Sequence, residues 1–337
     1  MLQIIKVLRK KHHLLFGARD DQGLIEARAK LISMGVKIFF PVTVDTLENQ
    51  LRSFFPDVVV LSRPNVVYEL AALVRRVAPK APIIYDTVDV HHLRLRRAGD
   101  DAARGMRELE RQAGEKSDQV WAISPEDAAV FQKLCPDRSI GVVSSAHTLT
   151  DSPSGPDGRQ GLIFIGNFAH PGNVAGLTWF FEKIWPQLII LAPATTLTIV
   201  GEGFPKTMHR FLGVEVRSRG YVENLEQLLA GVRVAIAPLT FGSGIKGKVL
   251  DPMAAGVPVV GTSIAVEGMG RDIIQAVTVA DGPEEFAKAC VKLMQDEDIW
   301  SKCCFAGQRI VAQKSSLKNL SRQLETALQK WQDAKPQ

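Results

Sequence analysis

The sequence predicts an α/β protein built from two Rossmann-like domains, each with a parallel sheet. Short β-branched apolar runs alternate with amphipathic segments along the whole chain, which is the pattern of βαβ units. A length of 337 residues fits two domains at roughly 100–200 residues each. Apolar residues make up 46% of the chain and charged residues 23%, a balance that favours a folded protein over a disordered one.

The boundary between the two series lies in the segment TLTDSPSGPDGRQ at 148–160, which is rich in proline, glycine, serine and aspartate. We therefore expect an N-terminal domain over 1–150, a C-terminal domain over 161–314 and an exposed linker between them. The amphipathic run near the end of the chain predicts a further helix within 315–337.

The N-terminal domain opens with a helical pattern, because Leu2, Ile5 and Leu8 recur at helical spacing. A doubly wound domain normally opens with a strand and a glycine-rich turn, so we expect this domain to lack its first strand. Helices are predicted from Val66 to Val77 and from Asp101 to Lys116. The predicted strands of this half are 13–17, 37–40, 57–62, 82–86 and 119–124.

The C-terminal domain contains six apolar runs that predict strands, with helical patterns between them. We expect them to form one parallel sheet with helices on both faces. The predicted strands are 161–166, 196–201, a run near 214–220, 233–239, 258–262 and 276–280.

Charge and cysteine usage exclude several classes of protein. The net charge of +5 comes without a long Lys/Arg block, so nucleic acid is not an expected partner, and only weak contact with an acidic membrane surface is expected. None of the four cysteines forms a CxxC pair, and none has zinc-ligand spacing to a histidine. No secretory signal or membrane-spanning run is present, so we expect a cytoplasmic protein, peripheral at most at the inner membrane face.

The segment 239–262 carries the clearest signal for a binding site. Gly244 and its neighbouring glycines follow a buried strand and precede a predicted helix, so backbone N–H groups and the helix dipole would face a ligand. Lys246 and Lys248 add two positive charges. A pyrophosphate is the ligand that this combination favours; the alternative is a solvated loop with two surface lysines.

The same segment resembles the donor-site signature of the retaining GT-B glycosyltransferases of family 4, the glycosyl transferases group 1. One branch of that family writes the signature G-x-G-I-K-G-K-x-x-E-A-M-A-A-G-x-P-V-V, and this chain reads GSGIKGKVLDPMAAGVPVV. The family's first glutamate falls on Ser243. Its second, which holds ribose hydroxyls of the donor, falls on Asp251, one methylene shorter.

Two further segments follow the family's order. FIGNFAHPGNVAG, from 164, resembles the opening of the donor domain, where Gly166 allows close backbone approach. The family's phosphate-clamping arginine and lysine fall on Asn167 and Asn173, for which turn and helix-cap roles are the alternative. Tyr221 and Val222 occupy the place that lines the nucleobase pocket; a packing role is the alternative there.

In the first domain, polar side chains follow the strand at 82–86. The stretch YDTVDVHHLR is similar to one that this branch of the family turns toward the cleft between its domains. Asp89 and His91 are therefore candidate catalytic residues, with His92 an equal alternative to His91, and helix capping is the alternative role for the aspartates. The basic residues that follow are interspersed with acids such as Glu108 and Glu110, a pattern typical of a solvated helix face.

The resemblance implies a GT-B fold, in which two Rossmann-like domains face each other across a cleft and the C-terminal helix returns to the first domain. It implies transfer of a sugar, with retention, from a nucleotide diphosphate sugar to a hydroxyl acceptor such as a glycan or lipid-linked sugar. Lys246 would be the third catalytic residue, and neither a metal nor a resident cofactor is expected. The alternatives are a sugar-nucleotide epimerase of the same fold and a non-catalytic donor-binding module.

Overall fold

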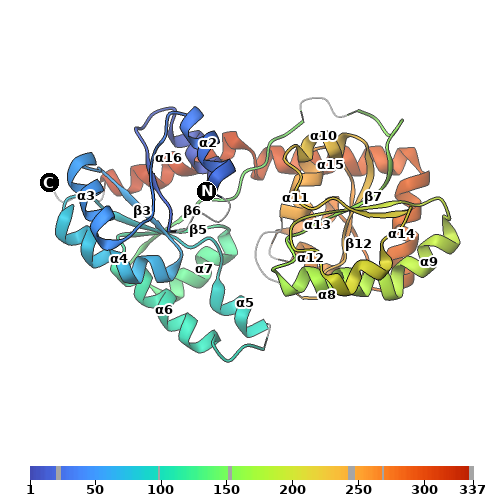
Figure 1. The fold of residues 1–337 in the computed structure, drawn as a ribbon, viewed down its shortest axis with the longest axis horizontal. Coiled ribbons are helices and arrows are strands. Elements are labelled where there is room, and N and C mark those ends of the chain that lie inside the picture. The colour runs from blue at the N-terminus through green and yellow to red at the C-terminus, as the bar shows by residue number, and fades with distance from the viewer. Residues whose placement is uncertain (20–23, 98, 151–153, 242–246, 268, 334–337) are drawn as a thin grey trace. The chain divides into compact units, whose positions relative to one another are not determined.

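The computed structural model describes the chain except residues 20–23, 98, 151–153, 242–246, 268 and 334–337. The chain forms two compact units (Figure 1). The first unit comprises 1–146 together with 317–337, and the second comprises 147–316.

The second unit contains one parallel sheet, as predicted. Its order is β12-β11-β10-β7-β8-β9, so the two strands that lie at its centre, β7 and β10, are neighbours. This is the order of a doubly wound dinucleotide-binding sheet, and the winding direction reverses between β7 and β10. The strands are β7 (Gln160–Ile165), β8 (Leu197–Val200), β9 (Val216–Ser218), β10 (Val232–Ala237), β11 (Val259–Gly261) and β12 (Thr278–Val279).

Helices cover both faces of that sheet because each central strand is apolar on both sides (Figure 1). In β7, Ile163 packs into one core while Leu162 and Phe164 pack into the other. The first core is closed by α10 (Leu225–Ala230), α11 (Gly247–Ala254), α12 (Ser263–Val266), α13 (Arg271–Ala276) and α15 (Glu297–Lys314). The second is closed by α8 (Pro171–Trp179), η1 (Phe180–Ile184), α9 (Trp185–Leu191), η2 (Lys206–Phe211) and α14 (Pro283–Gln295).

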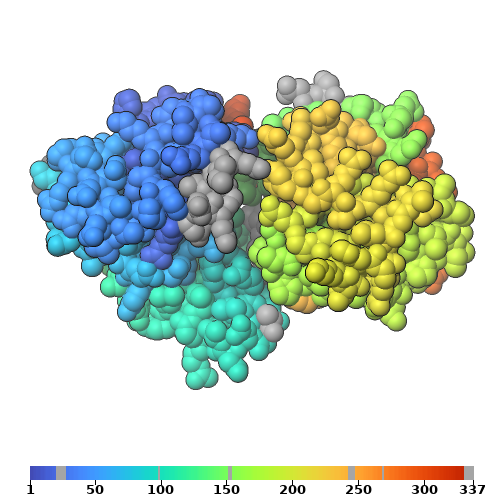
Figure 2. Space-filling model, viewed as in Figure 1, coloured from blue at the N-terminus to red at the C-terminus, as the bar shows by residue number. Residues whose placement is uncertain are grey.

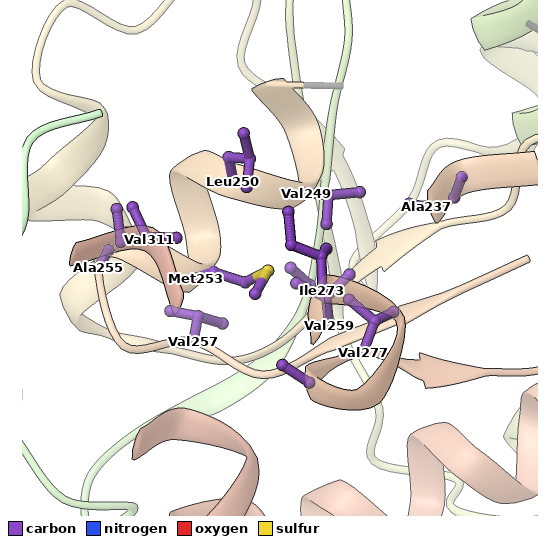
Figure 3. Close-up of a cluster of buried hydrophobic side chains, with 14 of the residues drawn as sticks. Ala237, Val249, Leu250, Met253, Ala255, Val257, Val259, Ile273, Val277 and Val311 are labelled. Atoms are coloured by element: carbon purple, nitrogen blue, oxygen red, sulfur yellow. The ribbon is translucent and has the colours of Figure 1, made fainter. Parts of the chain in front are cut away.

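Figure 3 shows how α11 is held in the first of these cores. Val249, Leu250 and Met253 are at most 2% exposed and pack among side chains that include Val259 and Val311. Burial of an aliphatic side chain of this size contributes roughly 1.5–3 kcal/mol, so the helix is firmly seated. The polar residues of α11 are thereby held at a fixed position on its other side.

The first unit contains two parallel sheets. Four strands pair in chain order, β3 (Val59–Ser62), β4 (Ile83–Asp86), β5 (Gln119–Ala122) and β6 (Ser139–Val142), and β1 (Leu15–Gly17) pairs with β2 (Lys37–Phe39). Five of these strands are predicted by the sequence, whereas β6 is not. Its residues SIGV include a serine and a glycine, both of which weaken a strand pattern.

The two faces of the four-stranded sheet are covered by helices from different parts of the chain. Consecutive parallel strands with right-handed crossovers put their connecting helices on one face. That face holds α3 (Val44–Phe54), α4 (Pro64–Val77), α6 (Ala103–Lys116) and α7 (Pro125–Leu134), with α5 (His91–Arg97) packed on α6. The other face is covered by α16 (Leu317–Asp333) and α1 (Leu2–Leu8), whereas α2 (Leu24–Ser33) packs beside β1 and β2.

The opening helix predicted from Leu2, Ile5 and Leu8 is confirmed by α1. The helix α16 is tied to the first unit by polar contacts as well as by its apolar stripe. The Gln119 side chain donates to the carbonyl of Ala327 at 2.9 Å. None of the described helices is long and apolar enough to cross a membrane.

The segment expected to be an exposed linker packs on the second unit at both of its ends. The Thr150 N–H donates to the carbonyl of Ala254 at 3.1 Å. Arg159 is only 6% exposed, and its guanidinium donates to the carbonyls of Leu229 and Val232. The expectation of exposure is wrong for Arg159, because backbone carbonyls satisfy its buried guanidinium.

Candidate functional site

The carboxyl ends of β7 and β10 lie side by side where the sheet reverses its winding, which is where open α/β sheets bind ligands. The loops after these two strands also touch. A Cβ atom on Gly176 of α8 would lie 2.4 Å from the carbonyl oxygen of Pro238, and one on Gly172 would lie 2.9 Å from that of Phe241. Glycine is therefore required for α8 to approach the loop after β10.

Gly166, predicted to allow close backbone approach, lies at such a position. A Cβ atom there would come within 2.8 Å of the Asn173 side-chain nitrogen. The end of β8 also lies close to the end of β7. A Cβ atom on Gly201, which follows β8, would lie 2.0 Å from the carbonyl oxygen of Gly166. Gly201 has φ of 140°, a conformation that favours glycine. These glycines bring the ends of β7 and β8 together with α8.

Asn167 and Asn173 shape the loop after β7. Asn173 is buried, and its amide nitrogen donates to the carbonyl of Asn167 at 2.6 Å. The Asn167 side chain accepts a hydrogen bond from the N–H of Ala169 at 2.8 Å, which is an Asx-turn contact. The turn role considered for Asn167 is therefore present, whereas Asn173 lies in the first turn of α8 and is not its N-cap. The Asn173 side-chain oxygen has another partner.

That partner is Lys248. Its ammonium donates to Oδ1 of Asn173 and lies 5.9 Å from the centre of the Phe164 ring. Lys248 is half-buried, whereas the alternative of a solvated loop would leave it at the surface. A cation from the helix after β10 thus reaches the amide that follows β7, where the family signature has a lysine.

Asp251 lies one turn further along α11, with its side chain 40% exposed. Its Oδ1 is 2.5 Å from Nδ1 of His147, a residue that is 8% exposed. Sequence reasoning missed His147, because it lies far from Asp251 in the chain and outside any motif. Among the predicted donor-site residues, Gly166, Asn167, Asn173 and Lys248 are joined by direct contacts, and Asp251 shares the helix of Lys248.

Tyr221 and Val222 follow β9, two strands away from β7. The N–H of Gly201 donates to the carbonyl of Gly220 at 2.8 Å, which links this turn to the strand ends described above. Tyr221 is 60% exposed, whereas Val222 is half-buried against the core beneath α10 and α11. The other two predicted residues of the glycine-rich loop, Gly244 and Lys246, lie outside the described residues.

In the first unit, Asp86 is the last residue of β4 and Asp89 follows that strand. Ser62 donates to the Asp86 carboxylate at 2.8 Å, and burial raises the pKa of Asp86. The Asp89 carboxylate accepts from the N–H of Val90 at 2.9 Å and lies 3.4 Å from the Arg94 guanidinium. This contact with the N–H of the next residue is not a helix-capping hydrogen bond, which would come from the second or third residue of α5.

His91 and His92 share one partner, the Glu110 carboxylate. The His91 N–H donates to it at 2.7 Å, and Nδ1 of His92 is hydrogen-bonded to it. Both histidines are 6% exposed and Glu110 is fully buried, so the expectation that Glu110 lies on a solvated helix face is wrong. Burial alone would raise the pKa of Glu110, but its hydrogen bonds with His91 and His92 outweigh that effect, and the pKa is lowered.

Asp127, in the first turn of α7, was not predicted. Burial and the nearby charge of Asp89 raise its pKa to about 6. Its Oδ2 is buried and has no hydrogen-bond partner among the described residues. In the sequence, Asp127 stands three residues after Ser124, the spacing of an N-cap residue and the third residue of a helix. That spacing indicates helix capping and not a functional carboxylate.

The basic stretch after β4 lies on α5 and α6, which form the teal surface at the lower edge of the first unit in Figure 2. Arg111 is paired with Glu108 at 2.6 Å and also with Glu115. Among the described residues, no group of three His, Cys, Asp or Glu side chains could hold a metal ion.

Residues 159–296 match the family described as glycosyl transferases group 1. A relative from Klebsiella pneumoniae, "Uncharacterized 44.6 kDa protein in cps region", is 32% identical over 136 residues. That match covers 38% of this chain and 35% of the relative, so it spans about a third of the relative's length.

Solved structures resemble most or nearly all of the chain. HepE from Anabaena, solved with UDP, superposes with a TM-score of 0.72 at 15% identity, over 98% of this chain and 95% of HepE. A glycosyltransferase from Rickettsia africae gives 0.70 at 13% identity, over 97% and 93%. TarM from S. aureus, in complex with fondaparinux, alpha-GlcNAc-glycerol and UDP, gives 0.68 at 12%, over 84% of this chain and 58% of TarM. The chain thus has the GT-B fold, and its resemblance to group 1 glycosyltransferases is confirmed.

Proposed function

We propose that this protein transfers a sugar from a nucleoside diphosphate sugar to a hydroxyl group of an acceptor. The observation that carries the proposal is the contact between Lys248 and Asn173 at the reversal point of the second sheet. It puts a cation where the resemblance predicts the donor diphosphate, even though asparagines replace the family's arginine and lysine in the loop after β7. The match to group 1 glycosyltransferases over residues 159–296 supports the same assignment.

The chemistry of such a site is electrostatic. In glycosyl transfer the bond between the anomeric carbon and the diphosphate oxygen breaks, and negative charge develops on the leaving diphosphate. A fixed cation at that group lowers the barrier because it interacts more strongly with the transition state than with the substrate. We assign this role to Lys248, and with it to Lys246, and we propose that no metal ion is needed. Retention of configuration follows from the resemblance and is part of the proposal.

In the first unit, Asp89 and His91 remain our candidates on the acceptor side. Their surroundings favour proton handling by carboxylates, because Asp127 beside Asp89 has a pKa of about 6 and therefore titrates near neutrality. The acceptor hydroxyl must lose its proton during transfer, and a group with such a pKa suits that task.

A thermal-shift screen against UDP, GDP, ADP and dTDP sugars tests the donor assignment, starting with UDP sugars because HepE and TarM were solved with UDP. A ligand at a hundredfold excess over its Kd should stabilise the protein by about 2.7 kcal/mol. The donor that binds is then incubated with pooled hydroxyl acceptors. A glycosylated product supports transfer, an epimerised sugar nucleotide supports an epimerase, and binding without either product supports a non-catalytic module.

A further inference from the structure

The donor site contains an aspartate where the family signature has a glutamate. Asp251 is one methylene shorter and its side chain is 40% exposed, so by itself the carboxylate would rotate freely about its side-chain bonds. A mobile carboxylate is a poor hydrogen-bond acceptor for a ligand, because binding must first order it. The structure shows what orders it.

Burial and a backbone hydrogen bond fix the position of His147 independently of its contact with Asp251. It is 8% exposed, and its backbone N–H donates to the carbonyl of Ser315 at the end of α15, at 2.8 Å. Its Nδ1 then lies 2.5 Å from Oδ1 of Asp251. Hydrogen bonds to a carboxylate are about twice as strong as those between neutral groups, so a buried imidazole can hold this carboxylate in one orientation.

The second carboxylate oxygen points toward the start of α11. A Cβ atom built on Gly247 would lie 3.3 Å from Oδ2 of Asp251, whereas the nearest His147 atom would lie 4.0 Å away. Oδ2 therefore lies beside Gly247, in the first turn of α11, the turn of the helix that also contains Lys248. The carboxylate thus presents one oxygen to His147 and the other to the first turn of α11.

We infer that His147 is a positioning residue that holds Oδ1 of Asp251 so that Oδ2 can accept a hydrogen bond from a ribose hydroxyl of the donor nucleotide. This inference rests on the proposed function. It gives the site a preference for ribonucleotides, because a 2′-deoxy or 3′-deoxy donor would leave Oδ2 without the hydroxyl that it is oriented to bind.

The test measures affinity by titration calorimetry for UDP, 2′-deoxy-UDP, 3′-deoxy-UDP and pyrophosphate, with GDP and ADP and their deoxy forms in parallel. The full-length protein is compared with His147→Leu, His147→Asn and Asp251→Ala. Asparagine carries an amide N–H close to the place of imidazole Nδ1–H, so His147→Asn is the conservative variant. The double variant with Asp251→Ala tests whether His147 acts through Asp251.

We expect the parent to bind the ribonucleotide roughly tenfold more tightly than one of the deoxy forms, as for one hydrogen bond to a charged group. His147→Leu should abolish that preference and leave pyrophosphate affinity unchanged, whereas His147→Asn should keep it. In the Asp251→Ala background, His147→Leu should have no further effect.

Three outcomes overturn the inference. If the parent binds ribo and deoxy forms equally, or if His147→Leu keeps the preference, His147 does not position Asp251 for ribose, although the proposed function stands. If His147→Leu weakens pyrophosphate as much as UDP, its role is general folding of the unit. If the parent binds none of UDP, GDP and ADP, the proposed function fails and the inference fails with it.

Discussion

The six-stranded sheet of the second unit and the four-stranded sheet of the first both carry polar side chains at the carboxyl ends of their strands. The contacts that hold these side chains differ between the two units. In the second unit, glycines such as Gly166, Gly176 and Gly201 let backbone segments meet, and Lys248 and Asp251 remain partly accessible above them. In the first unit, a buried carboxylate, Glu110, binds the backbone and imidazoles of the residues that looked most functional. The position at a strand end therefore identifies candidates, but partners from distant segments decide which of them can face a ligand.

The largest expected effect is on the first unit. Glu110→Ala leaves the buried backbone N–H of His91 and Nδ1 of His92 without their shared partner, and each buried group left unsatisfied costs about 1–3 kcal/mol. Urea unfolding monitored by circular dichroism measures this loss. Glu108→Ala, on the same helix but paired with Arg111 at the surface, is the matched control and should unfold like the parent. Equal midpoints for the two variants would mean that Glu110 does not hold the segment after β4.

In the second unit the comparable change is Gly176→Ala. Its Cβ would meet a backbone carbonyl at 2.4 Å, so α8 must move away from the loop after β10. Such overpacking costs typically about 1–3 kcal/mol, although alanine favours helix interiors. Gly231→Ala is the control, since its Cβ would have no neighbour nearer than 3.9 Å. The midpoints of thermal unfolding of the two variants are compared. If Gly176→Ala is as stable as Gly231→Ala, the close approach of α8 to the loop after β10 does not depend on a glycine at position 176.

Lys248→Met removes the cation and keeps most of the aliphatic stem. We expect nucleoside diphosphate binding to weaken roughly ten- to a hundredfold, as for loss of a hydrogen bond to a charged group. The affinity for the bare nucleoside should not change, because its ribose and base do not meet the ammonium. Calorimetry on Lys248→Met and on Lys288→Met, a surface lysine of α14 paired with Glu284, separates a local effect from a change in net charge. Equal affinities in both variants would remove the main support for the diphosphate site.

The smallest expected effect concerns Asp127. Its folded pKa, about 6, lies above the ordinary value of 3.8, so the unfolded chain loses this proton first as the pH rises. The stability associated with the protonated carboxyl is thus present below pH 3.8 and is lost as the pH rises through 6. After discounting for partial exposure, we expect a loss of about 1 kcal/mol between these values. Unfolding of Asp127→Asn at pH 4 and pH 6.5 should lack this loss; an unchanged slope would show that Asp127 is not perturbed.

Most of the fold could be predicted from periodicity and turn residues. All six strands of the second unit were found because each is an apolar run bounded by glycine, proline or polar residues. Strand β6 was missed because Ser139 and Gly141 interrupt its pattern, and pairing with β5 supplies what its own residues lack. The proposed donor-side residues could be named from the sequence because they lie in motifs of consecutive residues.

The remaining site features depend on contacts that no local pattern contains. The position of Glu110 in its amphipathic helix is typical of a surface acid. It is buried because α5, with His91 and His92, packs against α6. His147 meets Asp251 although the two residues lie far apart in the sequence. Arg159 looks like a solvated linker residue until its guanidinium is seen to bind carbonyls of the neighbouring strand and helix. In each case a charged group is satisfied by a partner distant in sequence, which composition and spacing do not reveal.

The assignment of α16 to the first unit has a consequence for synthesis on the ribosome. The second unit is continuous in sequence and can fold as soon as residue 316 has left the exit tunnel. The first unit emerges earlier, but the face of its sheet with Ile84 and Trp121 has only α1 of the described helices as a cover until residues 317–333 arrive. At roughly 5–20 residues per second, that wait lasts on the order of 10–40 seconds. During this time the nascent chain exposes the part of an apolar sheet face that α16 later covers, which makes it a natural client for chaperones that bind such surfaces.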